Sequence, residues 1–156
     1  MYDYLGYLED AYLVTKAGRY DIIGKKALET LHKYYAIDPI FITIRRGGRT
    51  EDMGMVLETV VYNELLSRGY EVFIGKTRKG EIDFAVRKDG RRCYLQAAYL
   101  LSSQETVSRE FGAYAAIRDN YPKYVLSLDK ADMGRDGIQH INIIDFLLGK
   151  QSLAFL

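Results

Sequence analysis

The segment from residue 53 to residue 100 constrains the fold most, because one long helix pattern is followed there by three short strand patterns. The helix is expected between Gly54 and Arg68, with Gly69 as its stop signal. Its apolar residues fall close to one face: Met55, Leu57, Val61, Leu65 and Leu66. Strands are predicted at 70–74, 81–87 and 92–100.

The elements around this segment complete a consistent pattern. Lys88-Asp89-Gly90 carries the hairpin signature between the second and third strands. A second helix at 103–120 and a strand at 124–128 follow, and a short strand with a closing helix is expected over 138–148. The order helix, three strands, helix, strand predicts an α/β domain with a central mixed β-sheet flanked by helices.

Composition excludes several classes of protein. The 156 residues have the length of one domain, about 100–200 residues. The net charge is +1, so nucleic acid could be held only by a local basic patch. The single Cys93 rules out an internal disulfide and a cysteine-based zinc site, and it fits a reducing, cytoplasmic compartment. No segment approaches the roughly 18 apolar residues of a membrane helix, so no membrane association is expected.

Three polar residues interrupt the apolar pattern of these elements. Glu58 lies in the first helix, Asp83 in the second strand and Gln96 in the third. Asp83 stands between Ile82 and Phe84, so strand alternation predicts that its side chain points to the opposite face from theirs. Gln96 likewise has apolar neighbours on both sides. The three side chains are therefore expected to converge at one end of the sheet.

Carboxylate and amide oxygens at such a place suit a hard divalent cation. Mg²⁺ prefers oxygen ligands, and a metal-bound water can attack a phosphodiester. A helix acid with a strand acid is therefore a candidate metal-dependent phosphodiesterase site. Structural alternatives remain for each residue, since Glu58 and Asp83 could face solvent and Gln96 could hydrogen-bond the backbone within the sheet.

The stretches LETVVYNELLSRGYEVFIGKTRKGEIDFAV and YLQAAYLL resemble the PD-(D/E)xK nuclease superfamily. The resemblance is closest to the C-terminal domain of bacterial and archaeal AAA-type ATPases. It implies a restriction-endonuclease-like fold over residues 53–156, preceded by a loop at 39–52. Residues 1–38 resemble the end of a winged-helix segment and the strand that enters the nuclease-like domain.

The resemblance also implies roles for individual residues. Glu58 matches the helix acid and Asp83 the strand acid, while Gln96 stands where the second acid is expected. These three residues are the expected catalytic groups and the ligands of Mg²⁺ or Mn²⁺ in an active site. Ala98 replaces the motif lysine, so strong cleavage activity is not expected. Lys76, Lys79 or Arg109 could supply the missing charge from a neighbouring element.

Basic residues near these positions suggest contacts with a nucleic-acid backbone, and DNA is the expected partner in preference to RNA. The predicted contacts are Lys76, Arg78, Lys79 and Arg109, and a second basic cluster comprises Arg45, Arg46 and Arg49. Gly75-Lys76-Thr77 is not a phosphate loop, because the glycine required five residues earlier is Tyr70 and a strand follows. ATP is therefore not expected to bind this chain alone.

Three functions remain open at this stage. The first is nucleic-acid engagement by a nuclease-like module with a degenerate site. The second is a catalytically dead nuclease fold that serves as an interaction or oligomerisation module. It would contact the N-terminal ATPase module or further copies of itself, and it predicts no metal affinity and an exposed apolar patch, rich in tyrosine. The third is metal-independent nucleic-acid binding, which predicts a steep salt dependence.

Overall fold

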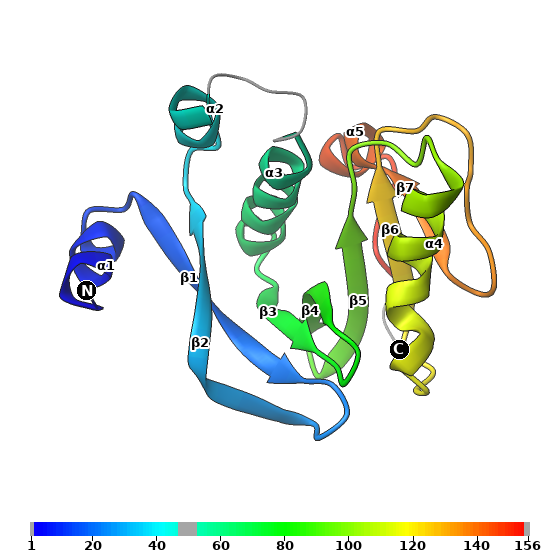
Figure 1. Cartoon of the computed structure of the whole chain (residues 1–156), viewed down its shortest axis with the longest axis horizontal. Coiled ribbons are helices and arrows are strands. Elements are labelled where there is room, and N and C mark those ends of the chain that lie inside the picture. Colours follow the sequence, from blue (N-terminus) through cyan, green and yellow to red (C-terminus); the bar gives the residue numbers. More distant parts are fainter. Residues whose placement is uncertain (1, 47–52, 155–156) are drawn as a thin grey trace.

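The computed structural model describes residues 2–46 and 53–154 as a sheet with helices on both faces (Figure 1). The helices are α1 (Tyr2–Asp10), α2 (Ile40–Arg46), α3 (Met53–Ser67), α4 (Gln104–Gly112), the 3₁₀ helix η2 (Ala113–Ala116) and α5 (Ile143–Leu147). The strands are β1 (Val14–Asp21), β2 (Lys26–Ala36), β3 (Glu71–Lys76), β4 (Glu81–Lys88), β5 (Arg91–Ala97), β6 (Lys123–Ser127) and β7 (Gln139–Asn142).

These strands form one mixed sheet in the order β2-β1-β3-β4-β5-β6-β7. The pairs β1/β2, β3/β4 and β4/β5 are antiparallel. The pairs β1/β3, β5/β6 and β6/β7 are parallel. The two predicted features of the fold, a mixed sheet and flanking helices, are therefore confirmed, as is the order helix, three strands, helix, strand from residue 53.

Each face of the sheet buries its own apolar core. The first core joins α3 and α5 to the sheet and contains Leu57, Val61, Phe84, Leu95 and Phe146. The second core lies under α4 and η2, and its members include Ile22, Ile82, Tyr94, Phe111, Tyr114 and Ile117. Burial of apolar side chains on both faces stabilises the sheet, at about 1.5–3 kcal/mol for each large side chain.

The second helix is shorter than the pattern predicts. It was expected to span 103–120, but α4 ends at Gly112 and continues only as the 3₁₀ turn of η2. Ser103 caps its start by accepting the Thr106 N–H. Ile117 takes an extended conformation, with φ −99° and ψ 111°, and its side chain is buried in the second core. Tertiary packing of Ile117 thus ends the helix early.

The expected boundaries before residue 53 also differ from the structure. The predicted loop at 39–52 begins with α2, which Asp38 caps by accepting the Ile40 N–H at 2.9 Å. Residues 47–52, with Arg49, lie outside the described residues, and the side chains of Arg45 and Arg46 are not described either.

Residues 2–38 do not stand apart from the segment that follows residue 53. β1 pairs in parallel with β3, with Gly18 opposite Phe73 and Asp21 opposite Lys76. β2 continues the sheet beyond β1, and buried Tyr35 belongs to the same core as α3. The first 38 residues therefore contribute two strands to the sheet.

Candidate functional site

Glu58 is held on α3 by two residues of β2. The Tyr35 hydroxyl donates to Glu58 Oε1 at 2.5 Å, and the Lys33 ammonium forms an ion pair with the same oxygen. Strand alternation places Lys33 and Tyr35 on one face of β2, towards α3. The Tyr35 ring stacks on Tyr62 with 4.0 Å between the ring centroids, which fixes the position of the hydroxyl.

A β-bulge places Asp83. Phe73 lies opposite Ala85 and Gly75 lies opposite Ile82, so β4 has one residue more than β3 in this interval. As a result Ile82 is buried in the second core and Phe84 in the first. The prediction that Ile82 and Phe84 share one face, with Asp83 on the other, is wrong because it assumed a regular strand.

The Gln96 side chain connects β5 to β4 next to this bulge. Its carbonyl oxygen accepts the Asp83 N–H at 2.6 Å, and the Ala97 N–H donates to Asp83 Oδ2 at 2.9 Å. Side chains thus replace the regular backbone pairing between β4 and β5 at this point. Backbone hydrogen bonding, the structural alternative for Gln96, is what the structure shows.

The second face of the sheet completes this polar network. The Gln96 amide donates to Glu110 Oε2 of α4 at 3.1 Å. Glu110 is 5% exposed, and its other oxygen accepts the guanidinium of the exposed Arg109. Ala98, where the motif lysine was expected, is buried in the second core. The network runs from Lys33 on one face to Arg109 on the other.

Burial and a neighbouring charge control the protonation of Asp83. Burial raises the pKa of Asp83 to about 7, and the Glu58 carboxylate contributes to the same shift. The Ala97 N–H and the Lys33 charge oppose the shift. Burial also raises the pKa of Tyr35, with a further contribution from Glu58, so its hydroxyl stays a donor.

One side-chain oxygen of each expected Mg²⁺ ligand already accepts a hydrogen bond from the protein. Oε1 of Glu58, Oδ2 of Asp83 and the Gln96 carbonyl all accept hydrogen bonds from the protein itself. Within residues 2–46 and 53–154, no group of three His, Cys, Asp or Glu side chains is placed to hold a metal ion. A metal bound through Oε1 of Glu58 would compete with Lys33 and Tyr35 for that oxygen.

The predicted basic residues do not contact the two acids. Lys76 pairs with Glu81 at 3.8 Å, and Arg109 pairs with Glu110. Arg78 and Lys79 are exposed on the turn between β3 and β4. None of these four residues has a hydrogen bond or ion pair with Glu58 or Asp83 among the described contacts.

Three residues of the network were not predicted as members. Lys33 and Tyr35 lie in a strand that the sequence shows only as an apolar-rich run, with no sign that it pairs near α3. The sequence feature that could have identified Glu110 as a member is its position beside Phe111 and three residues after Val107. Both of these residues are buried. An acid next to the buried stripe of a helix suggests a buried partner, here Gln96.

Comparison with known proteins gives one informative match. The chain is 36% identical over 146 residues to an uncharacterized protein of Haemophilus influenzae. The match covers 93% of this chain and 36% of that protein, so the chain spans about a third of the length of its relative. No protein-family model and no solved structure matches the chain.

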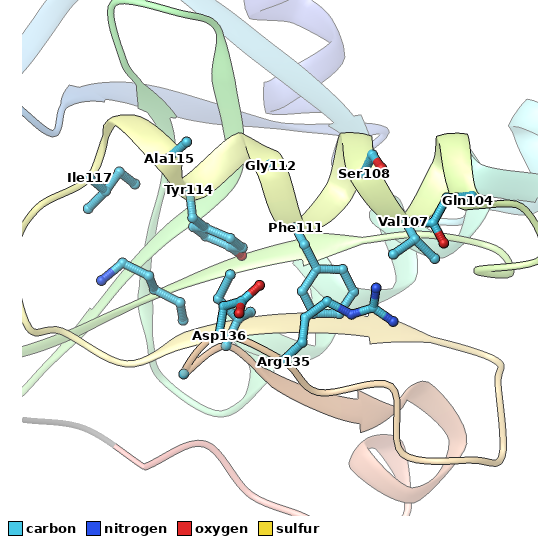
Figure 2. Close-up of a pocket in the computed structure, with 13 residues that line it drawn as sticks. Gln104, Val107, Ser108, Phe111, Gly112, Tyr114, Ala115, Ile117, Arg135 and Asp136 are labelled. Carbon is cyan, nitrogen blue, oxygen red and sulfur yellow. The ribbon is translucent and has the colours of Figure 1, made fainter.

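A cavity of about 630 Å³ lies between α4, η2 and the loop before β7. Figure 2 shows Phe111 and Tyr114 pointing from the helix towards Arg135 and Asp136 on that loop. The Arg135 guanidinium lies 4.9 Å from the centre of the Phe111 ring. None of the predicted site residues lines this cavity, so it is separate from the Glu58–Asp83 network.

None of the described helices is long and apolar enough to cross a membrane.

Proposed function

We propose that this chain is a nuclease-like module that engages nucleic acid without efficient cleavage. The observation that carries the proposal is the hydrogen bonding at the site. Glu58 and Asp83 come close enough to influence one another, yet protein donors already bind Oε1 of Glu58 and Oδ2 of Asp83. The helix acid and the strand acid remain, while the chemistry that they would support has been replaced by internal hydrogen bonds.

Two features support a restriction-endonuclease-like fold for this module. The succession α3, β3, β4, β5, α4, β6 has the order expected from the resemblance to PD-(D/E)xK nucleases. Glu58 and Asp83 also approach one another from the helix and the strand where the resemblance puts the two acids. Fold alone does not define activity, so the proposal depends on the residues of the site.

Cleavage would need groups that are hydrogen-bonded or ion-paired within this site. A hydrolytic site needs oxygen ligands for a metal and a cation beside the phosphate. Here Gln96 is hydrogen-bonded to the Asp83 N–H and to Glu110, and Lys33 forms an ion pair with Glu58. An ion pair in a partly buried site is costly to separate, because each charge then lacks its partner.

We also propose that the module belongs to a larger AAA-type ATPase and contacts its N-terminal ATPase part. The relative from Haemophilus influenzae supports this assignment by its length, since about two thirds of it lies outside the matched region. The resemblance of the chain to C-terminal domains of such ATPases supports the same view.

The test combines metal binding with nucleic-acid binding. Calorimetry with Mn²⁺ is expected to show no binding at millimolar concentrations in the wild-type chain or in Asp83→Asn. Fluorescence anisotropy with labelled DNA is expected to show binding that EDTA does not weaken. Metal-dependent cleavage of single- or double-stranded DNA, abolished by Asp83→Asn, would show that the network opens into an active site.

A second function has its own observation. Exposed apolar side chains gather on α1, the turn after it and the neighbourhood of α2: Tyr4, Tyr7, Tyr12, Leu13, Ile37, Ile40 and Phe41. Tyr7 is 67% exposed and Tyr12 is 80% exposed. Such a surface favours a protein interaction module. If the chain binds neither metal nor nucleic acid at low salt, this function replaces the first.

A further inference from the structure

Four basic residues surround a hollow on the side of the sheet covered by α4 and η2. Lys25 comes from the turn between β1 and β2, Arg78 and Lys79 from the turn between β3 and β4, and Arg118 from the segment after η2. The hollow has a volume of about 610 Å³. We call it the basic hollow. Its remaining lining residues are Ile22, Ile23, Ala115, Ala116, Ile117 and Asp119.

The positive charge of the basic hollow is not neutralised within the described protein. No ion pair found in residues 2–46 and 53–154 involves Lys25, Arg78, Lys79 or Arg118. The one acid that lines the hollow, Asp119, already accepts the Tyr94 hydroxyl at 2.8 Å and faces Lys123 at 3.6 Å. A concave surface with charge of one sign concentrates ions of the other sign.

The two turns that carry three of these cations are held in place. Asp21 Oδ1 accepts the N–H groups of Ile23 and Gly24, which shapes the turn before Lys25. Thr77 is buried and pairs with Gly80 through both its N–H and its hydroxyl. The cations therefore project from ordered turns, so less conformational entropy is lost when an anion binds.

A backbone contact joins the two turns. The Ile22 N–H donates to the Lys76 carbonyl at 3.0 Å, directly after the last paired residues of β1 and β3. This contact holds Lys25 near Arg78 and Lys79, although more than fifty residues separate them along the chain. The cluster is thus a product of the fold.

No residue of the Glu58–Asp83 network lines the basic hollow. Ile22 and Ile117, which line it, belong to the second core. Leu57 and Val61, the neighbours of Glu58 on α3, belong to the first core on the opposite face. Arg78 and Lys79 line the basic hollow and have no hydrogen bond or ion pair with Glu58 or Asp83 among the described contacts.

We propose that the basic hollow binds consecutive phosphate groups. Lysine and arginine are the usual partners of phosphate oxygens, and cations from three separate segments suit a ligand with several charges. The exposed apolar side chains of Ile23 and Ala115, which also line the hollow, would face the sugars and bases of a nucleic-acid strand. A nucleic-acid backbone and free polyphosphate share this chemistry. The assignment to nucleic acid rests on the function proposed above.

The test compares Arg78→Gln/Lys79→Gln with a control variant that removes one arginine and one lysine elsewhere. The control is Arg91→Gln/Lys130→Gln, because both residues are exposed, lie outside the hollow and have no ion pair in the described structure. Each variant is titrated with a labelled single-stranded 20-nucleotide DNA, a duplex of the same sequence and inorganic tripolyphosphate. Thermal unfolding verifies that both variants fold.

The hollow variant is expected to bind DNA at least tenfold more weakly at about 0.1 M salt, and the control less than threefold more weakly. Its salt slope for single strands should fall by about 1.4, since each lost phosphate contact contributes about 0.7. Tripolyphosphate should bind the wild type and the control but not the hollow variant.

The other outcomes separate the two proposals. Equal DNA binding by the hollow variant and the control would overturn the phosphate site while leaving nucleic-acid engagement intact. Binding of tripolyphosphate alone, lost in the hollow variant, would support the phosphate site and overturn the proposed function. No binding of either ligand would overturn both.

Discussion

Asp83 is held in its charged form less readily than an ordinary carboxyl, because burial and the Glu58 carboxylate both raise its pKa to about 7. Two interactions oppose this rise of the Asp83 pKa. The Ala97 N–H stabilises the ionised form of Asp83, and Lys33 neutralises Glu58 at close range. Glu58, Asp83 and Lys33 thus form a set of interacting charges whose protonation depends on pH.

The first prediction concerns this pH dependence. In the unfolded chain Asp83 has a pKa near 3.8, so between that value and about 7 the folded state holds a proton that the unfolded state has lost. Folding stability should therefore decrease as the pH rises through this interval. Between pH 5 and pH 8 the Asp83 contribution to the free energy of unfolding should fall by about 2–3 kcal/mol.

The variant Asp83→Asn should remove this part of the pH dependence. Asparagine keeps a carbonyl oxygen for the Ala97 N–H but carries no charge beside Glu58. Urea unfolding at pH 5 and at pH 8 measures the effect. The free energy of unfolding of the variant, relative to that of the wild type, should be higher at pH 8 than at pH 5. Parallel pH profiles for the two proteins would contradict the assigned environment of Asp83.

At the scale of elements, close approach of neighbouring strands determines the geometry around β3. Gly75 lies in β3 between the turn that contains Ile22 and the β4 residue Ile82. A Cβ atom at this position would lie 2.7 Å from Ile22 Cδ1 and 3.0 Å from Ile82 Cβ. The glycine therefore allows the two turns of the basic hollow to lie side by side.

The second prediction follows from this contact. Gly75→Ala should destabilise the chain by about 1–3 kcal/mol, the usual cost of overpacking a core. Ile22→Val removes the Cδ1 atom and should cost about 0.5–1.5 kcal/mol alone. In the double variant the total should be clearly less than the sum, as measured by urea unfolding. Additive costs would mean that the strands move apart, so that the new Cβ atom at position 75 does not contact Ile22 Cδ1.

Local pattern accounts for the elements that the sequence predicted well. The helix predicted at 54–68 and the strands predicted at 70–74 and 81–87 agree closely with the structure, because periodicity and the Asp89-Gly90 turn are local signals. The strand predicted at 92–100 is also present, but it ends at Ala97. The bulge at Asp83 was not predictable in this way, since it depends on the register with β3. Lys33 was missed for a related reason. Its place beside Glu58 depends on the sheet order, which the sequence does not state.

The candidate site shows the same division. Residue type and order identified Glu58, Asp83 and Gln96, and the structure connects Asp83 to both of the others. Their partners Lys33, Tyr35 and Glu110 come from other elements. Whether a polar residue is a ligand or a structural hydrogen-bond partner depends on these long-range contacts. That distinction could not be made from spacing alone.

At the scale of the whole molecule, residues 2–38 and 53–154 contribute strands to one sheet. β1 and β2 extend the sheet next to β3, and they bury Ala17, Tyr20 and Tyr35 against the two cores. Without them β3 would become an exposed sheet edge, and its unpaired backbone groups would favour aggregation. The helix α1 differs, because Tyr4 and Tyr7 on its surface are exposed.

The last prediction uses this difference. A chain that lacks residues 1–10 should fold, with a melting temperature within a few degrees of the full chain, because α1 lies outside the sheet. A chain that lacks residues 1–38 should fail to fold. Loss of Tyr20, Ile22 and Tyr35 from the cores removes about 5–9 kcal/mol of burial, which is comparable with the total stability of a domain. Circular dichroism and size-exclusion chromatography measure both. A folded, monomeric 39–156 fragment would instead support the boundary at residue 38, because α3 and β3 to β7 would then be stable by themselves.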